Sequence, residues 1–518
     1  MSLSYQQVLS ALQQIDPAAL QFVRGIEKEG LRVNADSQIS QVPHPQELGS
    51  ALTHTHITTD YSEALLEFIT PAKNDPKAVL DTLKELHSFT ASKIGSERIW
   101  PFSMPGIIND ELDVPIAYFG ESNTGQLKHI YRHGLWHRYG RKMQCIAGLH
   151  YNFSVPDSLW QFKADLNGKS VSKNYISGEY FSLIRNFRRY SWLLLYLFGA
   201  SPALDKSFIE EDGHGLVSLD DDTLYGPYAT SLRMSGLGYQ NNAQDGLFVC
   251  FNGLPSYTQT LKDAMSQSVA KYQDIGVEKD GVYMQLNTNL LQIENEYYSD
   301  IRPKRNSKNG EKPLTALNEH GVEYIEVRCL DLNPFTPYGI DEEQIHFMDL
   351  FLTYCIVHPS PLLSAEECSE VEQNHKKVVI DGRDPAFELM RHGEPVLLSK
   401  WGIELIAQLK PLAEILDGKH QTKDYSSALA SMEQRMLDSS LTPSAKILAA
   451  MKENGQSFTH FANQQADKIN QQYASNINPV RTEFWHNAAK DSLAKQREIE
   501  DSDLVRFNQY LADYQVKV

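Results

Sequence analysis

Four acidic side chains stand in apolar stretches of this chain, where an ionised carboxylate is costly. Glu27 and Glu29 lie in GIEKEGLRV, Glu67 in EALLEFITP and Glu326 in EYIEVRCLDLNP. A carboxylate among apolar neighbours needs a compensating charge, and acids from distant segments commonly share a divalent cation. The pattern therefore predicts an enzyme that handles a highly charged substrate through Mg²⁺.

The spacing of the first two acids favours a strand. On a strand, residues i and i+2 share one face about 6.5 Å apart, which lets two carboxylates hold neighbouring divalent ions. The alternative for Glu27 and Glu29 is a solvated edge strand, because Lys28 stands between them. For Glu67, whose neighbours are apolar, the alternative is a buried ion pair with an arginine.

Two further stretches with period two carry polar side chains on one face. Glu326 and Arg328 share a face of YIEVRCL, and His150 and Asn152 share a face of GLHYNFSV. A metal-bound carboxylate beside a guanidinium suits phosphoryl transfer, although the two could equally form a structural pair. His150 is either a metal ligand or a hydrogen-bonded core histidine.

Other side chains are candidates for binding a small substrate. Arg233 and Tyr239, in ATSLRMSGLGY, suit an α-carboxylate, and Tyr131 and Tyr298 could wall a small side chain. Asp60 precedes Glu67 closely enough to belong to the same site. The alternative for each of these residues is a purely structural role, and for Asp60 it is a turn or a helix cap.

A short cationic cluster is the candidate for the phosphates of a nucleotide. It consists of Arg302, Lys304 and Arg305 in IRPKR, and a solvated loop would look the same. Familiar nucleotide motifs are missing. NGKS resembles the end of a P-loop, but the first glycine of that motif would fall at Lys163. GLGYQN has Asn241 where a dinucleotide fingerprint needs its third glycine. Any nucleotide is therefore expected to bind in another way.

The elements that must position these residues change in type along the chain. Residues from about 20 to 335 mix strands and helices, whereas residues from about 340 to 518 are mainly helical. We expect an α+β fold, with an antiparallel sheet that has one polar face. The helical part is expected to pack on the sheet, so that residues 1–518 form one catalytic unit. The stretch from Val282, VYMQLNTNLLQIENEYYS, is also predicted to be an extended strand.

Composition excludes several classes of protein. A formal net charge of -18 argues against nucleic-acid binding, which needs a basic surface. The 5 cysteines show no CxxC spacing, so neither a zinc site nor a disulfide framework is indicated, and a reducing cytoplasm is expected. The apolar run from Tyr190 to Ala200 falls short of the roughly 20 residues that a membrane span needs. It is predicted to be a buried helix.

Six motifs together resemble the glutamate–cysteine ligase family of the gammaproteobacterial type. They are RGIEKEGLRV, GSALTHTHITTDYSEALLEFITP, GLHYNFSV, ATSLRMSGLGY, LNTNLLQIENEYYSDIRPKR and YIEVRCLDLNPF. The resemblance implies ATP- and Mg²⁺-dependent ligation of the L-glutamate γ-carboxylate to the L-cysteine amine through γ-glutamyl phosphate. It also implies a glutamine-synthetase-like fold, in which a curved antiparallel sheet forms a funnel around the site.

The resemblance assigns roles residue by residue. The implied metal ligands are Glu27, Glu29, Glu67, His150 and Glu326. Arg328 would grip the phosphoryl group, Arg233 would bind a substrate carboxylate, and Asp60 would lie close to the site. Asp60 is also our candidate for steering or accepting the proton of the amine. The cysteine pocket would comprise Tyr131, Leu135, Tyr239, Tyr298 and Tyr61, with Asn152 also among the substrate-binding residues. Tyr61 departs from the Phe expected there, and Gly30 from a bulkier residue.

The resemblance also sets expectations for partners and product. The ion is expected to be Mg²⁺, with Mn²⁺ as the alternative, and glutathione is expected as a feedback inhibitor of a monomeric enzyme. The chain ends at Val518, too early for the ATP-grasp domain that adds glycine in bifunctional relatives, so γ-glutamylcysteine is the expected product. The alternatives are a ligase with another amine acceptor, an inactive binding protein of the same family, and a metal-dependent hydrolase.

Overall fold

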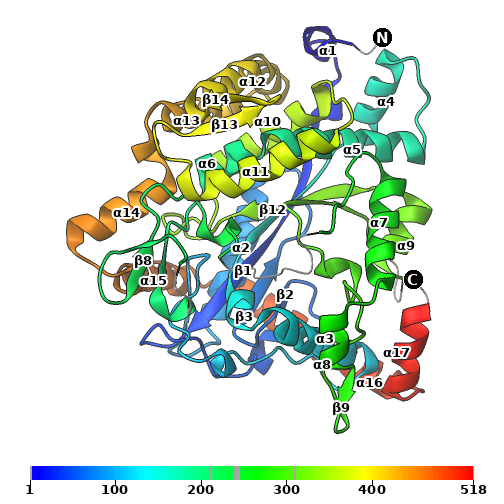
Figure 1. Ribbon diagram of the computed structural model, residues 1–518, viewed down its shortest axis with the longest axis vertical. Helices are drawn as coiled ribbons and strands as arrows, with labels where there is room; N and C mark the ends of the chain where they lie inside the picture. The colour runs from blue at the N-terminus through cyan, green and yellow to red at the C-terminus, as the bar shows by residue number, and fades with distance from the viewer. Residues whose placement is uncertain (1–2, 210–212, 238–245, 308–310, 517–518) are drawn as a thin grey trace.

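A seven-stranded antiparallel sheet lies at the centre of the computed structural model, which describes residues 3–209, 213–237, 246–307 and 311–516 (Figure 1). The strands pair in the order β11-β12-β5-β1-β3-β2, and β4 pairs with β1. Their bounds are β1 Val23–Val33, β2 Ile57–Thr59, β3 Leu65–Ile69, β4 Arg98–Ile99, β5 Leu149–Ser154, β11 Ile301–Lys304 and β12 Tyr324–Leu330. The predicted α+β class and the strands predicted around the acidic residues are confirmed.

The register of the sheet places the acidic side chains on one face. Glu27 on β1 is paired with His150 on β5, and Glu29 on β1 is paired with Glu67 on β3. Glu326 on β12 is paired with Asn152, two residues from His150 on the same strand. Paired residues share a face, and so do residues i and i+2, so the register alone brings all of these side chains to one side.

The other face of the sheet is packed against helices α2 (Pro76–Ala91) and α10 (Glu342–Val357). Lys28 is buried there, with its Nζ 3.0 Å from His87 Nε2 of α2, and burial lowers the pKa of the Lys28 ammonium to about 7. Arg24 forms an ion pair of 2.7 Å with Asp349 of α10. The alternative of a solvated edge strand is therefore wrong, because β1 is central and Lys28 points into the core.

Helices surround this sheet and confirm most of the helical predictions. The buried apolar run forms α6 (Trp192–Phe198), and α14 (Pro443–Asn454) begins after Thr442, whose side chain accepts a hydrogen bond from Ala445 N. The other long helices are α1 Tyr5–Leu12, α3 Asn123–Tyr139, α4 Asp157–Leu166, α5 Lys173–Tyr190, α7 Leu254–Ser266, α9 Pro313–His320, α11 Ala365–Asp381, α12 Leu398–His420, α13 Asp424–Leu437, α15 Phe458–Ser475, α16 Pro479–Ser502 and α17 Phe507–Val516.

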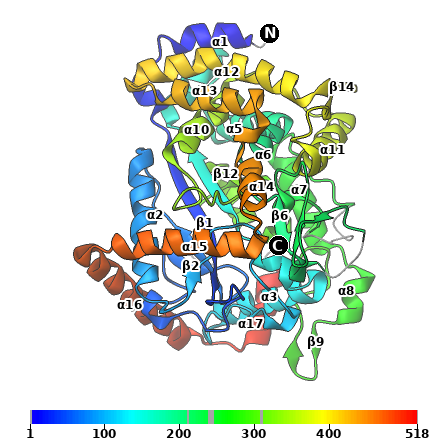
Figure 2. The ribbon, with the colours of Figure 1, turned by 90° about the vertical axis from the view of Figure 1, so that its left-hand side faces the viewer.

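The last helices return to the sheet region. In Figure 2, α15 crosses beside β1, and it packs against α2 and β4. The Ser50 backbone N–H donates to Ser492 Oγ of α16 at 2.9 Å, which ties this helix to the loop before β2. Among the residues that the structure describes, no helix is both long enough and apolar enough to cross a membrane.

The strand predicted from Val282 onward is wrong. Only Val282–Tyr283 form a strand, β10, in a small hairpin with β9 (Glu278–Lys279), and the chain then turns irregularly. The amide side chains there bond to the backbone: Gln285 Nε2 donates to Tyr272 O at 2.7 Å, and Asn287 Nδ2 donates to Gln292 O at 3.1 Å. Such local bonds compete with a strand ladder.

Small sheets also form outside the stretches for which strands were predicted. Strands β6 (Ala203–Asp205), β7 (Val217–Ser218) and β8 (Thr223–Tyr225) form one sheet. Strands β13 (Glu388–Arg391) and β14 (Glu394–Leu397) form a hairpin within the helical last third. None of these strands reaches the acidic face, so they do not change the prediction for the site.

Candidate active site

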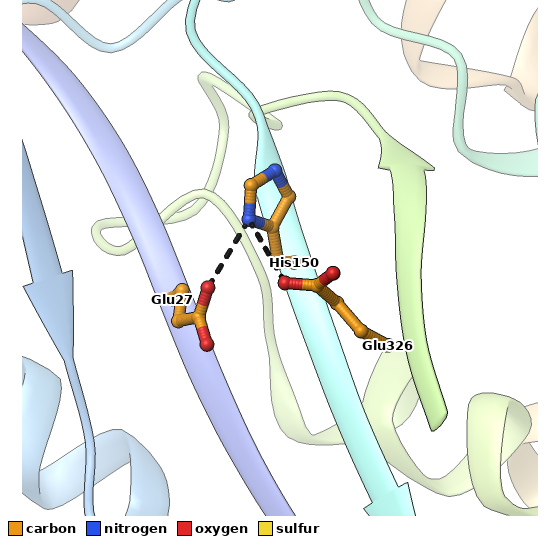
Figure 3. Close-up of side chains that lie close together, drawn as sticks. All are labelled: Glu27, His150 and Glu326. Carbon is orange, nitrogen blue, oxygen red and sulfur yellow. Dashed lines mark hydrogen bonds and ion pairs between the residues drawn. The ribbon is translucent and has the colours of Figure 1, made fainter. Parts of the chain in front are cut away.

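Three side chains from three neighbouring strands meet on the polar face of the sheet (Figure 3). The distance from His150 Nδ1 to Glu27 Oε2 is 3.3 Å, and that to Glu326 Oε1 is 3.8 Å. One ligand atom from each residue lies within 4.8 Å of those of the others. The imidazole of β5 thus lies between a carboxylate of β1 and a carboxylate of β12.

Two more carboxylates extend this group along β1 and β3. Glu29 Oε1 lies 3.7 Å from His150 Nε2, and the Gly148 N–H donates to Glu29 Oε2. Glu67 faces the same side through its pairing with Glu29. We call the five residues Glu27, Glu29, Glu67, His150 and Glu326 the acidic basin. The structure brings together all five residues predicted as metal ligands.

An irregularity in the sheet aims a guanidinium at the basin. The pairing of β12 with β5 shifts by one residue between Val327 and Leu330, so Arg328 lies at a β-bulge beside His150. Its Nη1 is 3.1 Å from Glu326 Oε2 and 3.5 Å from His150 Nδ1. Lys304 of β11 adds a second cation, with its Nζ 3.4 Å from Glu326 Oε1.

Burial and crowding shift the pKa values of the carboxyls in opposite directions. Burial, followed by repulsion from Glu27, Asp60 and Glu29, raises the pKa of Glu67 well above its usual value. Burial would also raise the pKa of Glu326, but Lys304, Arg328 and His150 hold it well below its usual value. The carboxyls on the Glu67 side therefore repel one another when they are ionised, and a bound cation would relieve this repulsion.

This donor set fits a hard divalent cation. Carboxylate oxygens are the ligands that Mg²⁺ and Mn²⁺ prefer, and one imidazole is compatible with Mn²⁺ in particular. On the structure's own geometry, Glu27, His150 and Glu326 would hold an ion, with Glu29 and Glu67 at its side.

A cavity of about 730 Å³ opens above the basin. Its lining includes most of the residues predicted for the site: Glu27, Asp60, Tyr61, Glu67, Tyr131, Leu135, His150, Arg233, Tyr298, Arg302, Lys304, Glu326 and Arg328. Glu29, Asn152 and Arg305 are not part of this lining, and Asn152 Nδ2 donates to Glu27 Oε1 at 2.9 Å. Tyr239 lies outside the described residues.

Four residues that line this cavity were predicted for the cysteine pocket. Tyr131 and Leu135 enter it from α3, and Tyr61 and Tyr298 enter it from loops. The Tyr61 hydroxyl is buried and has no hydrogen-bond partner among the described residues. Arg233 also lines the cavity, and its Nη2 donates to the Arg328 carbonyl at 2.8 Å. We call the part of the lining formed by Tyr61, Tyr131, Leu135 and Tyr298 the aromatic recess.

A second cavity, of about 310 Å³, lies next to the first. Arg302 and Lys304 line both cavities, whereas Arg305 lines only the smaller one. Tyr257 and Tyr324 supply aromatic surface there. Arg302 Nη2 donates to the Asn295 carbonyl at 3.0 Å, so this guanidinium also fixes the wall between the cavities.

Sequence reasoning missed two cations of α3. Lys128 and Arg132 line the larger cavity, and Arg132 Nε donates to the Asp60 carbonyl. Burial lowers the pKa of the Lys128 ammonium to about 8. Residues three and four apart share a helix face. The prediction of Tyr131 and Leu135 could therefore have included both cations.

Comparison with known proteins leads to one family. The sequence profile described as glutamate-cysteine ligase matches residues 8–378. A glutamate–cysteine ligase of Pseudomonas fluorescens is 50% identical over 500 residues, which cover 96% of this chain and 94% of that protein. The one of Pseudomonas aeruginosa is 48% identical over 506 residues, with coverages of 97% and 95%.

Solved structures agree with the sequence comparison. The crystal structure of glutamate–cysteine ligase from Francisella tularensis in complex with AMP matches with a TM-score of 0.90 and 35% identity, covering 96% of this chain and 98% of that one. A bifunctional glutathione synthetase from Pasteurella multocida shares the fold with a TM-score of 0.69 and 24% identity, covering 90% of this chain and 54% of that one.

Replacing Glu67 tests whether its ionisation in the buried basin destabilises the protein. Because the folded-state pKa of Glu67 is raised, its stabilising proton is lost as the pH rises through that pKa, and the metal-free protein loses stability there. Glu67→Gln, which cannot ionise, should match the wild type near pH 4 and be more stable at pH 8, by about 1.4 kcal/mol for each unit of the shift. Thermal melting in EDTA at both pH values measures this difference.

The exposed Glu388 of β13 provides the matched control, because Glu388→Gln should follow the wild type at both pH values. Equal stability of Glu67→Gln and the wild type at pH 8 would show that Glu67 ionises without cost.

Proposed function

Because this chain belongs to the glutamate–cysteine ligase family, we propose that its acidic basin joins the γ-carboxylate of L-glutamate to the amine of L-cysteine. The reaction is ATP-dependent, gives γ-glutamylcysteine, and is the first step of glutathione biosynthesis. The observation that carries the assignment to the basin is the convergence of Glu27, His150 and Glu326 within 4.8 Å.

The chemistry explains why acids and cations lie together. A carboxylate oxygen of glutamate attacks the γ-phosphorus of ATP and ADP leaves, which gives γ-glutamyl phosphate. The amine nitrogen of cysteine then attacks the carbonyl carbon, phosphate leaves, and the nitrogen loses a proton. Both substrates of the first step are anions, so the site must offset their repulsion and the charge that spreads over the phosphoryl oxygens.

We assign the metal ligands to the basin. Glu27, His150 and Glu326 would hold one Mg²⁺, and Glu29 and Glu67 offer oxygens for that ion or a neighbouring one. When bound, Mg²⁺ would screen the triphosphate and the γ-carboxylate from each other. Asn152 supports this set of ligands, because its hydrogen bond of 2.9 Å to Glu27 fixes the orientation of that carboxylate.

Arg328 is the residue assigned to the transferred phosphoryl group. The bulge in β12 and the ion pair with Glu326 hold its guanidinium at the edge of the basin, so little reorganisation is needed when charge develops. Asp60 lines the same cavity and is the candidate that steers or accepts the proton of the amine. The hydrogen bond from Arg132 to the Asp60 carbonyl holds that segment in place.

We place the cysteine side chain in the aromatic recess of the larger cavity. Tyr61, Tyr131, Leu135 and Tyr298 would contact its thiol and methylene. Arg233, which is buried and lines the same cavity, would bind a substrate carboxylate. Aromatic and aliphatic side chains of this kind suit a short side chain.

We place the nucleoside of ATP in the smaller cavity. Arg302 and Lys304 line both cavities, so a nucleotide with its base beside Tyr257 and Tyr324 would direct its phosphates along these cations toward Glu326. Arg305 would contact it from the smaller cavity. The AMP bound to the Francisella protein supports a nucleotide site in this fold.

Four properties stay predictions. They are that residues 1–518 act as one catalytic unit, that the enzyme is a monomer, that it works in the cytoplasm, and that glutathione inhibits it. A glutathione molecule carries the same γ-glutamyl and cysteinyl groups as the product, so it would bind in the same larger cavity.

Glu326→Gln should keep the fold and remove most activity at low Mg²⁺. The amide retains the shape of the side chain but loses the charge that a cation needs, and a ligand loss of this kind typically costs at least about tenfold in metal affinity. The measurement is ADP release in the presence of glutamate and cysteine over a range of Mg²⁺ concentrations, with Glu388→Gln as control. Wild-type turnover at every Mg²⁺ concentration would contradict the metal assignment.

Tyr298→Ala should raise the KM for cysteine far more than the KM for ATP. Truncation opens the recess for the small side chain but leaves the second cavity intact, and loss of a few contacts there is worth about 1–3 kcal/mol, or roughly 10–200-fold. Initial rates with each substrate varied in turn measure both constants. Equal changes in the two KM values would place Tyr298 outside the cysteine pocket. The control is Tyr228→Ala at an exposed position, which should leave both KM values unchanged.

A further inference from the structure

Helix α3 carries a row of histidines on the side away from the cavity. His129, His133 and His137 follow one another at intervals of four residues, so they lie one turn apart on one helix face. Tyr131, Arg132 and Leu135 line the cavity from another face of the same helix. The histidines therefore have no place in the reaction described above.

The first two histidines are arranged as a chelating pair. His133 Nε2 lies 3.1 Å from His129 Nε2. Two imidazole nitrogens that bind one ion at about 2.0–2.1 Å each are about 3 Å apart when the angle at the ion is near 90–100°. The two nitrogens, which a hydrogen bond joins here, are thus already at the separation that a shared ion requires.

A backbone contact fixes which nitrogen of His129 is free. His129 Nδ1 lies 2.7 Å from the Ala117 carbonyl oxygen, which can only accept, so Nδ1 carries the hydrogen. In the neutral ring the lone pair is then on Nε2 and accepts the hydrogen bond from His133 Nε2–H. An ion that binds both nitrogens replaces this hydrogen bond, and the hydrogen of His133 then moves to Nδ1 of its own ring. A carbonyl that orients an imidazole in this way is the usual support of a histidine metal ligand.

Charged groups of both signs lie near this pair. Arg141 is the nearby cation that opposes an ion at this place. Its guanidinium is stacked 3.7 Å from the Trp136 ring centre. Its backbone N–H donates to Glu111, so this residue brings a carboxylate near Arg141.

We propose that His129 and His133 form a chelating site for a divalent first-row transition ion such as Ni²⁺, Zn²⁺ or Cu²⁺. Imidazole nitrogen favours these ions over Mg²⁺, which prefers oxygen. Water fills the remaining coordination positions. His137 is not a ligand, because its ring stacks on Trp136 at 4.3 Å and its centre is 6.5 Å from that of His133.

Binding of Ni²⁺ to the full-length, untagged protein tests this site. Calorimetric titration is carried out in parallel on the wild type and on the double variant His129→Gln/His133→Gln, so that ions bound by the acidic basin, which also contains an imidazole, are subtracted. We expect the wild type to bind one Ni²⁺ per chain more than the double variant. His129→Gln and His133→Gln should each weaken binding at least about tenfold, because each removes half of the chelate. His137→Gln should bind as the wild type does.

The exposed His486 of α16 is a helical histidine with no histidine one turn away, so His486→Gln is the matched control. Thermal melting of each variant confirms its fold, and either of the two ligand variants decides the question if the other is unstable. Equal Ni²⁺ affinity in the wild type, His129→Gln and His133→Gln would overturn the proposal. A loss in His137→Gln as large as that in His133→Gln would also overturn it.

Discussion

Repulsion between carboxylates on one face of the central sheet is the constraint on which this structure depends. Glu27, Glu29, Glu67 and Glu326 come from three strands, and the antiparallel register brings them together around His150. Lys304 and Arg328 lie within 3.4 Å of Glu326 and hold its pKa down, whereas the pKa of Glu67 stays raised although Arg328 opposes the shift. A bound cation would screen the remaining repulsion and would also attract a polyanionic substrate.

The side of the sheet away from the cavity makes this arrangement rigid. Side chains that alternate with the acids on β1 are anchored to helices, Arg24 to Asp349 and Lys28 to His87. Ligands on strands that are fixed in this way are held more precisely than ligands on loops. The bulge that aims Arg328 is the one local departure from regular pairing between β5 and β12, and it occurs where the chemistry needs a side chain to be turned.

The sequence allowed the basin to be predicted because its physical signal is local. A carboxylate in an apolar period-two stretch is unusual, and the strands around Glu27, Glu67 and Glu326 formed as expected. The stretch from Val282 failed because Gln285 and Asn287 bond to the backbone, a competition that alternation does not reveal. Arg132 and Lys128 were missed because the sequence does not show which face of their helix meets the sheet. The bulge at Arg328 could not be predicted because it depends on the pairing of two distant strands.

The most direct test is a crystal of the protein with Mn²⁺ and a non-hydrolysable ATP analogue, measured for anomalous scattering at the manganese edge. The account predicts Mn²⁺ bound by Glu27, His150 and Glu326, with the terminal phosphate on the same ion and beside Arg328. Manganese elsewhere, with the five basin side chains bound only to arginine and lysine, would contradict it.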